Sequence, residues 1–222
     1  NAIVRVDPQT KQVRKWPLPS EAAGANLNTA AFDSARRLWF TGQSGWYGRL
    51  DPVAGEIRVW KSPRGPGPYG ITATPGGEIY YASLAGNYIA HVDTATGAAT
   101  VIEPPTARQG ARRLIADLRG QIWVSYWNTG QVGRYDPSTG AWREWKLPGS
   151  AQAYAIWVDD RGQVWLSDWT ANALVRFDPT SEQFASFTSS RSGARVRELA
   201  GRAGEVWGAE SGNDRLVLQP TH

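Results

Sequence analysis

The sequence predicts an all-β protein, a β-propeller of four-stranded antiparallel blades, with about five blades in its 222 residues. Two landmarks recur along the chain at intervals of roughly 42 residues, and short runs of alternating polar and apolar residues lie between them. A repeat of that length that holds four strands is typical of a propeller blade. We therefore expect one domain over residues 1–222.

Two sets of residues mark the repeat. The first is an aromatic residue in the strand after a short turn, and its members are Trp39, Tyr80, Trp123, Trp165 and Trp207. The second is an acidic residue that ends the following strand, and its members are Asp7, Asp51, Asp93, Asp136 and Asp178. A third set of aromatic residues lies in the outermost strand: Trp16, Trp60, Trp145 and Phe187. We expect both aromatic sets to pack between blades as core residues.

Each repeat divides into four short strands. In the third copy these are RRLIADL, QIWVSYW, QVGRYD and AWREWKL, with the turns RG, NTG and PSTG between them. Alternation with a period of two, bounded by Gly, Asn, Asp and Pro, predicts strands joined by hairpin turns. The DPSTG segment suits a tight turn, because Asp bonds its own backbone, Pro presets φ and Gly supplies a positive φ.

The chain enters the repeat partway through a blade. Residues 1–19 supply only a third and a fourth strand, and the C-terminus supplies a first, a second and a weak third strand, namely RELAG, EVWGAE and DRLVLQ. In one interpretation the two ends join into a composite blade, which removes open sheet edges. In the other the chain is a piece of a longer propeller. We favour the longer propeller for the natural product, and a closed five-bladed ring stays open for these residues.

Composition narrows the function classes. The chain has no Cys, which excludes disulfides and thiolate metal sites. Its net charge of +4 comes from single Arg residues and not from a basic block, so no nucleic-acid partner is expected. No apolar run is long enough for a membrane span. A processed chain without Cys suits a periplasmic or secreted protein, although a cytosolic fragment would have the same composition.

Three strings resemble the repeats of the virginiamycin B lyase (streptogramin lyase) family: PYGITATPGGEIYYAS, GQIWVSYWNTGQVGRYDPSTG and GQVWLSDWTANALVRFDP. The likeness runs along the full chain. It implies a seven-bladed propeller with a Mg²⁺-assisted site that opens the ester of a cyclic depsipeptide antibiotic by elimination, which is an antibiotic-resistance activity. In such a site a neutral His takes the proton α to a carbonyl, and the cation stabilises the enolate that forms.

The chain departs from this family at the catalytic positions. The family base is a His in a Pro-His-Gly turn, and the corresponding positions hold Asn28, Tyr69, Arg112, Tyr154 and Arg197. Its own histidines lie elsewhere, because His91 takes the Arg position of a third strand and His222 ends the chain, where we expect disorder. The family's metal carboxylates correspond to Gly42, Ser83, Tyr126, Asp168 and Glu210. No catalytic residue is thus expected here, and Asp168 and Glu210 are the candidate Mg²⁺ ligands.

Propeller ligands usually bind at one mouth of the central channel, where the loops that enter the first strands meet those that join the second and third. The candidate ligand-binding residues there are Tyr69, Arg112, Arg113, Trp127, Tyr154, Trp169 and Arg197, with Trp46 beside them. Aromatic faces with guanidinium groups suit a planar or peptide-like ligand that carries carboxylate or phosphate. The alternative is that these residues only seal the channel, with Arg paired to Asp168 or Glu210.

Three functions stay open. The first is a C–O lyase of the streptogramin lyase family, represented by a chain that lacks the catalytic His and most metal carboxylates and is inactive by itself. The second is a non-catalytic propeller that binds a small molecule or a peptide at its channel mouth. The third is an interaction propeller that uses its outer faces. The fold alone does not choose among them.

Overall fold

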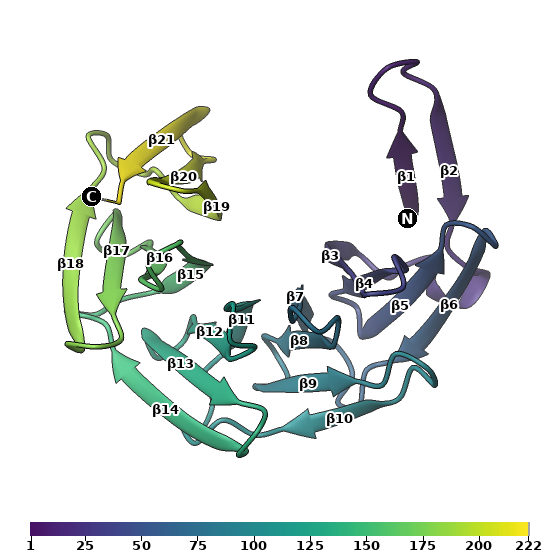
Figure 1. The fold of residues 1–222 in the computed structure, drawn as a ribbon, viewed down its shortest axis with the longest axis horizontal. Helices are drawn as coiled ribbons and strands as arrows, with labels where there is room; N and C mark the ends of the chain where they lie inside the picture. Colours follow the sequence, from purple (N-terminus) through teal and green to yellow (C-terminus); the bar gives the residue numbers. More distant parts are fainter. Residues whose placement is uncertain (222) are drawn as a thin grey trace. The chain divides into compact units, whose positions relative to one another are not determined.

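The computed structural model describes residues 1–221, and its regular structure is β-strand apart from one turn of 3-10 helix. The strands form antiparallel sheets, shown as successive groups of arrows in Figure 1. The chain divides into two compact units, residues 1–102 and residues 103–222. Within each sheet the strands lie in chain order, because every strand joins the next through a tight turn.

The first unit holds a hairpin and two four-stranded sheets. The hairpin pairs β1 (Ala2–Val6) with β2 (Val13–Pro17), and the 3-10 turn η1 (Ser20–Ala22) follows it. The first of the two sheets consists of β3 (Leu27–Phe32), β4 (Leu38–Gly42), β5 (Trp46–Asp51) and β6 (Glu56–Lys61). The second consists of β7 (Pro68–Ala73), β8 (Ile79–Ser83), β9 (Tyr88–Val92) and β10 (Ala99–Ile102).

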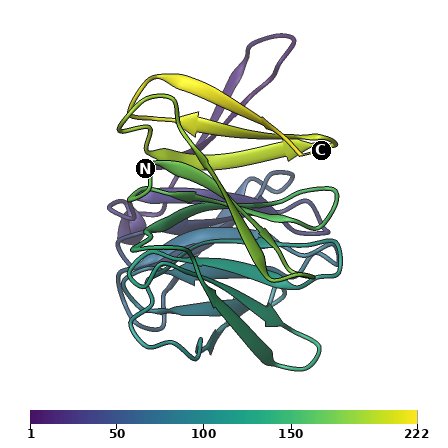
Figure 2. The ribbon, with the colours of Figure 1, turned by 90° about the vertical axis from the view of Figure 1, so that its left-hand side faces the viewer.

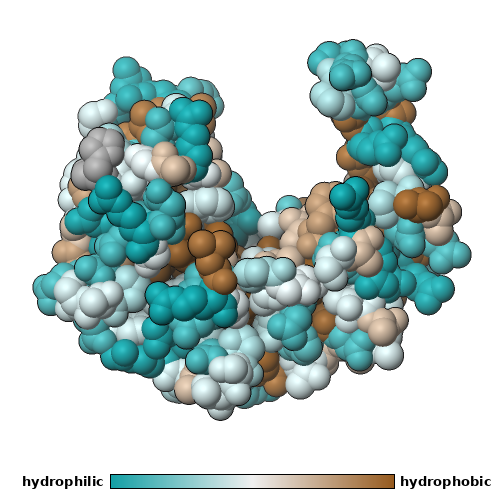
Figure 3. Space-filling model, in the orientation of Figure 1, coloured by the Kyte–Doolittle hydropathy of each residue, from teal (hydrophilic) through white to brown (hydrophobic). Residues whose placement is uncertain are grey.

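Aromatic residues fill the space between the two sheets of the first unit. Trp39, Tyr47 and Tyr81 are buried in this core, and the rings of Trp39 and Tyr47 both stack on Trp60. The hairpin has a different surface: its turn is hydrophilic in Figure 3, while Val4, Val6 and Val13 on its strands are more than half exposed. The two sheets therefore hold most of the core of this unit.

The second unit holds two four-stranded sheets and one three-stranded sheet. The first consists of β11 (Ala111–Ala116), β12 (Ile122–Tyr126), β13 (Gln131–Asp136) and β14 (Ala141–Lys146). The next consists of β15 (Ala153–Val158), β16 (Val164–Asp168), β17 (Ala173–Asp178) and β18 (Gln183–Thr188). The last consists of β19 (Val196–Arg202), β20 (Glu205–Glu210) and β21 (Arg215–Pro220).

Successive sheets of the second unit stack face to face, as Figure 2 shows for β15–β18 and β19–β21. Their first strands lie side by side, with β15 in contact with both β11 and β19. The junction between the first two sheets is filled by an apolar core that includes Trp123, Leu147 and Phe177. Each junction thus buries the inner faces of two neighbouring sheets.

The same two polar contacts recur around the tryptophans of the second strands, an Asp acceptor for the indole N–H and an Arg over the ring; we call them the polar bracket. In three sheets the indole N–H donates to the Asp that directly follows the first strand: Trp39 to Asp33 at 2.9 Å, Trp123 to Asp117 at 3.1 Å and Trp165 to Asp159 at 2.8 Å. An Arg of the third strand lies over the same ring in each case: Arg49, Arg134 and Arg176. The bracket gives each buried indole N–H its acceptor.

The predicted all-β fold with antiparallel sheets of up to four strands is confirmed. Of the five predicted core anchors, four are buried, and the prediction is wrong for Trp207, which is half-buried. The reason is that only one face of β20 is buried: Val206 and Glu210 lie on it and Trp207 on the other, whereas both faces of β12 and β16 are buried. Trp207 donates to Glu205 of its own strand, at 3.0 Å. The count of five blades, the closure of a ring and the single domain stay predictions.

The two ends of the chain contribute to separate sheets, the β1–β2 hairpin and β19–β21. The expected third strand DRLVLQ is present as β21, paired with β20. None of the described residues belongs to a helix long and apolar enough to cross a membrane. His222, for which disorder is expected, lies outside the described residues.

Candidate functional site

A β-bulge in the first strand of each of the five larger sheets positions the candidate residues. The pairing between the first and second strands shifts between Leu27 and Ala30, Pro68 and Ile71, Ala111 and Leu114, Ala153 and Ile156, and Val196 and Leu199. Every position that corresponds to the family His lies inside one of these shifts: Asn28, Tyr69, Arg112, Tyr154 and Arg197. Because a bulge turns side chains away from the regular alternation, it aims these residues out of the ladder.

Hydroxyl groups on the second strands fix the bulged segments from the neighbouring sheet. Ser125 Oγ donates to the carbonyl oxygen of Tyr154 at 2.6 Å, and Ser167 Oγ donates to that of Val196 at 2.8 Å. Thr41 makes the same bond to the carbonyl of Tyr69 in the first unit. These buried bonds satisfy carbonyls that the bulge removes from the strand ladder.

Four side chains of the second unit form a continuous stack. The guanidinium of Arg112 lies 3.7 Å from the ring centroid of Tyr154. Tyr154 stacks on Trp169 with centroids 4.9 Å apart and ring planes at 13°. The guanidinium of Arg197 lies 5.2 Å from the centroid of Trp169. We call Arg112, Tyr154, Trp169 and Arg197 the Arg–aromatic stack; both of its rings lie between a cation and another ring.

Trp127 closes one side of the Arg–aromatic stack. Its ring meets Tyr154 and Trp169 edge to face, with interplanar angles of 87° and 86°, and the Arg112 guanidinium lies 4.3 Å from its centroid. Trp169 is held in turn by its indole N–H, which donates to the carbonyl of Val196 at 2.9 Å. The stack therefore combines residues of three strands, β11, β15 and β19, with Trp169 from the loop after β16, and Trp127 adds a contact from the loop after β12.

Arg113 and Arg197 also contact polar side chains, those of Glu198 and Ser211. Arg113 forms an ion pair with Glu198 at 3.1 Å, and Arg197 Nε donates to Ser211 Oγ at 3.0 Å. Desolvation raises the pKa of the Glu198 carboxyl, and the attraction of Arg113, which lowers it, is the smaller effect. The alternative interpretation, in which these residues only seal the channel and Arg pairs with Asp168 or Glu210, stays a prediction.

Six of the seven predicted ligand-binding residues gather in the second unit: Arg112, Arg113, Trp127, Tyr154, Trp169 and Arg197. Tyr69 and Trp46 belong to the first unit, where both side chains are buried. His91 is on β9, where it faces Tyr80 across the strand pair and contacts Glu78 at 3.8 Å. The strand role predicted for His91 is confirmed.

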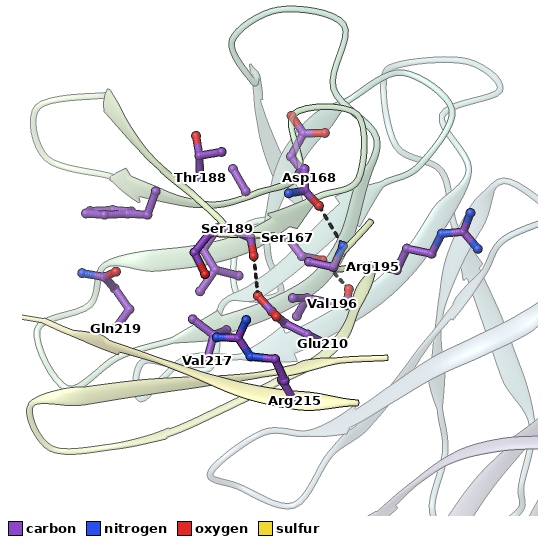
Figure 4. Close-up of a pocket in the computed structure, with 16 residues that line it drawn as sticks. Ser167, Asp168, Thr188, Ser189, Arg195, Val196, Glu210, Arg215, Val217 and Gln219 are labelled. Atoms are coloured by element: carbon purple, nitrogen blue, oxygen red, sulfur yellow. Dashed lines mark hydrogen bonds between the residues drawn. The ribbon is translucent and has the colours of Figure 1, made fainter. Parts of the chain in front are cut away.

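The two candidate metal ligands, Asp168 and Glu210, are both 3% exposed. Asp168 accepts hydrogen bonds from the backbone N–H groups of Gln152 and Thr170, and Glu210 Oε1 accepts one from Ser189 at 2.7 Å. Figure 4 shows the two carboxylates at opposite ends of the same lining. Nowhere in residues 1–221 do three potential acidic or His ligands come together. Mg²⁺ is usually held by one or two carboxylates and keeps waters at its other positions, and Mg²⁺ binding by this pair stays a prediction.

A pocket of about 220 Å³ opens between β15–β18 and β19–β21, and we call it the junction pocket (Figure 4). Its apolar lining comes from Leu174, Phe187, Val196 and Val217. Its polar lining includes Asp168, Ser189, Glu210, Arg215 and Gln219. The sequence interpretation missed Ser189, Arg215 and Gln219. Comparison with the preceding repeat could have pointed to two of them, because polar residues replace apolar ones there. Ser189 takes the position of Leu147, and Gln219 takes the position of Phe177.

No protein-family model and no curated protein sequence matches this chain. Among solved structures, virginiamycin B lyase from Staphylococcus aureus is 22% identical with a TM-score of 0.86, over 100% of this chain and 78% of that one. A streptogramin B lyase structure is 21% identical with a TM-score of 0.84, over 100% and 76%. The extracellular domain of a protein described as a one component system from B. thetaiotaomicron is 14% identical with a TM-score of 0.77, over 98% and 30%. Over its whole length this chain therefore resembles the virginiamycin B lyases in fold.

Proposed function

We propose that this chain is a virginiamycin B lyase-like propeller that binds a small molecule or a peptide through a carboxylate or phosphate group at the Arg–aromatic stack, without carrying out chemistry itself. The observation that supports it is the stack: the guanidinium groups of Arg112 and Arg197 lie 3.7 Å and 5.2 Å from the centroids of two stacked aromatic rings. All of its residues lie in the second unit.

Stacking leaves the edge of a guanidinium group available. A cation on a ring uses its flat face for the ring, while its N–H donors point outward in the plane, where a carboxylate or phosphate accepts two of them. Arg197 is exposed, and only its Nε is engaged in a hydrogen bond, to Ser211. Because this guanidinium is bonded to Ser211 and lies against Trp169, less side-chain entropy is lost when an anion binds.

The inner-strand positions supply no base of the family type. They hold Asn, Tyr and Arg, and the described histidine, His91, is engaged with Tyr80 and Glu78. Elimination needs a group that accepts a proton near neutral pH. The likeness in fold thus supports a shared scaffold, and the residues support binding over catalysis.

Binding is tested by calorimetry and thermal shift with a short linear peptide that has a free C-terminal carboxylate, a nucleoside monophosphate and a sugar acid. We expect at least one of these to bind, and Arg197→Ala to weaken it by about tenfold or more, because a charge-assisted bidentate contact is lost. Arg197→Lys keeps the charge without the planar fork and should also weaken it. Arg119→Ala, a change to an exposed arginine outside the stack, is the matched control. An Arg197→Ala variant that binds as tightly as the wild type contradicts the proposal.

A second candidate function, a C–O lyase of the streptogramin type, is favoured by the fold and by the presence of both Asp168 and Glu210 on one pocket. Incubation with virginiamycin B and Mg²⁺, followed by mass spectrometry, separates the two candidates. Ring opening shifts no mass by itself, so the linear product is identified by chromatography and fragmentation. We expect none; turnover that is lost in Glu210→Gln would favour the lyase and overturn the first proposal.

A further inference from the structure

The junction pocket occupies a place that an apolar core fills at the preceding junction. Leu147 and Phe177 are almost fully buried between β11–β14 and β15–β18. One repeat later, Ser189 and Gln219 take the corresponding positions, and both line the pocket. The backbone hydrogen bond at this position is the same in both repeats, since the N–H of Leu147 donates to the carbonyl of Gly130 and the N–H of Ser189 donates to that of Asn172. The pocket thus results from smaller or polar side chains in a backbone that the two repeats share.

Glu210 gives the pocket a buried charge. Ser189 Oγ donates to its Oε1, while Oε2 is buried and accepts no hydrogen bond from any residue between 1 and 221. A buried carboxylate oxygen without a donor is unfavourable, because it has lost its hydrogen bonds to water and gained none in the protein. Native proteins seldom keep such a group without a partner, which points to a donor from outside the chain.

Arg215 gives the pocket the opposite charge. It is the cross-strand neighbour of Glu210 in the β20–β21 pair, is exposed and lines the same pocket. Across the described chain neither residue has an ion-pair partner, and they do not pair with each other. Figure 4 places the guanidinium of Arg215 beside Val217, on the same side as Glu210. A carboxylate acceptor and a guanidinium donor therefore flank one cavity.

We propose that the junction pocket binds a small zwitterion with an apolar side chain, which is the chemistry of a free apolar α-amino acid. Its ammonium group donates to Glu210, its carboxylate accepts from Arg215, and its side chain packs on Leu174 and Phe187. The volume of about 220 Å³ suits a molecule of this size. This site is separate from the Arg–aromatic stack and does not depend on the function proposed for it.

Titration calorimetry of the whole chain with L-leucine tests the proposal, with isoamylamine and 4-methylpentanoate as ligands that keep the carbon chain and each lack one charge. L-leucine should bind at least about tenfold more tightly than either. Equal binding of isoamylamine would show that Arg215 plays no part, and no heat with L-leucine would show a pocket that holds solvent only. Either result overturns the assignment. The stack is tested with other ligands, so failure of one proposal does not hide failure of the other.

Variants locate the binding in the pocket. Glu210→Gln keeps the shape of the side chain and removes its charge, and should weaken L-leucine binding by about tenfold to a hundredfold. Glu205→Gln, on the same strand but outside the pocket, is the matched control. The double variant Ser189→Leu/Gln219→Phe introduces the residues of the preceding junction; it should abolish binding while the protein stays folded by circular dichroism. Unchanged binding in a folded double variant contradicts the proposal.

Discussion

Asp33, the acceptor for the indole of Trp39, shows how a single residue connects the strands of one sheet. Asp33 accepts from the indole of Trp39 and from both the backbone and the guanidinium of Arg37. Burial tends to raise the pKa of Asp33, but these hydrogen bonds and the Arg37 charge together lower it below its ordinary value. The folded state therefore prefers the ionised carboxylate more strongly than the unfolded chain does.

This preference makes the contribution of Asp33 to stability depend on pH. Because the folded pKa is depressed, the contribution is complete above the unfolded pKa of about 4 and is lost as pH falls through the folded value. We expect Asp33→Asn to be less stable than the wild type at pH 7, and the gap to narrow below about pH 4. Urea unfolding at several pH values measures this difference in the free energy of unfolding between the wild type and the variant. Asp160→Asn, at an exposed carboxylate, is the control, and a gap that stays constant with pH contradicts this account.

At the scale of the element, tight turns determine where each strand begins. The predicted Asp turns are confirmed: Asp51 and Asp136 each accept backbone N–H bonds from the residues that follow. Glycines with positive φ complete many of these turns, and two of them differ in their surroundings. Gly130 has φ +61° and a Cβ there would lie 2.3 Å from the Ala151 carbonyl oxygen, whereas at Gly140, with φ +72°, nothing lies within 4 Å.

These two glycines form a matched pair for mutation. Gly140→Ala should cost about 1–2 kcal/mol, which is the strain of a left-handed backbone with a side chain. Gly130→Ala adds a clash with backbone that cannot move freely, so we expect a loss of roughly 3 kcal/mol or more. Chemical denaturation of the two variants under the same conditions compares them. Equal losses would show that the close approach to Ala151 does not matter.

At the scale of the whole molecule, much of the strand pattern was predictable because it depends on local sequence. The anchors, the turns and the third strand DRLVLQ follow from alternation and turn residues. The bulges were not predictable, because a register shift leaves no mark in a pattern of polar and apolar residues. For the same reason the sequence named the members of the Arg–aromatic stack but not their mutual stacking, in which both faces of Tyr154 are covered by Arg112 and Trp169.

The two compact units lead to a prediction about the chain as a whole. Residues 103–222 contain the Arg–aromatic stack, the junction pocket and a core of their own around Trp123 and Phe177. We expect a fragment of these residues to fold, with a β-type circular dichroism spectrum and cooperative unfolding, and to retain L-leucine binding. An unfolded fragment would instead favour the single domain over residues 1–222 that the repeat predicts.

The carbonyl of Val196 accepts from both Trp169 and Ser167, and Val196 also lines the junction pocket. The peptide group of Val196 thus connects the junction pocket to Trp169 of the Arg–aromatic stack. Indole emission responds to nearby charge and to the strength of its N–H bond. We therefore expect the fluorescence of Trp169 to change when a ligand occupies either site. The change should be absent in Trp169→Phe.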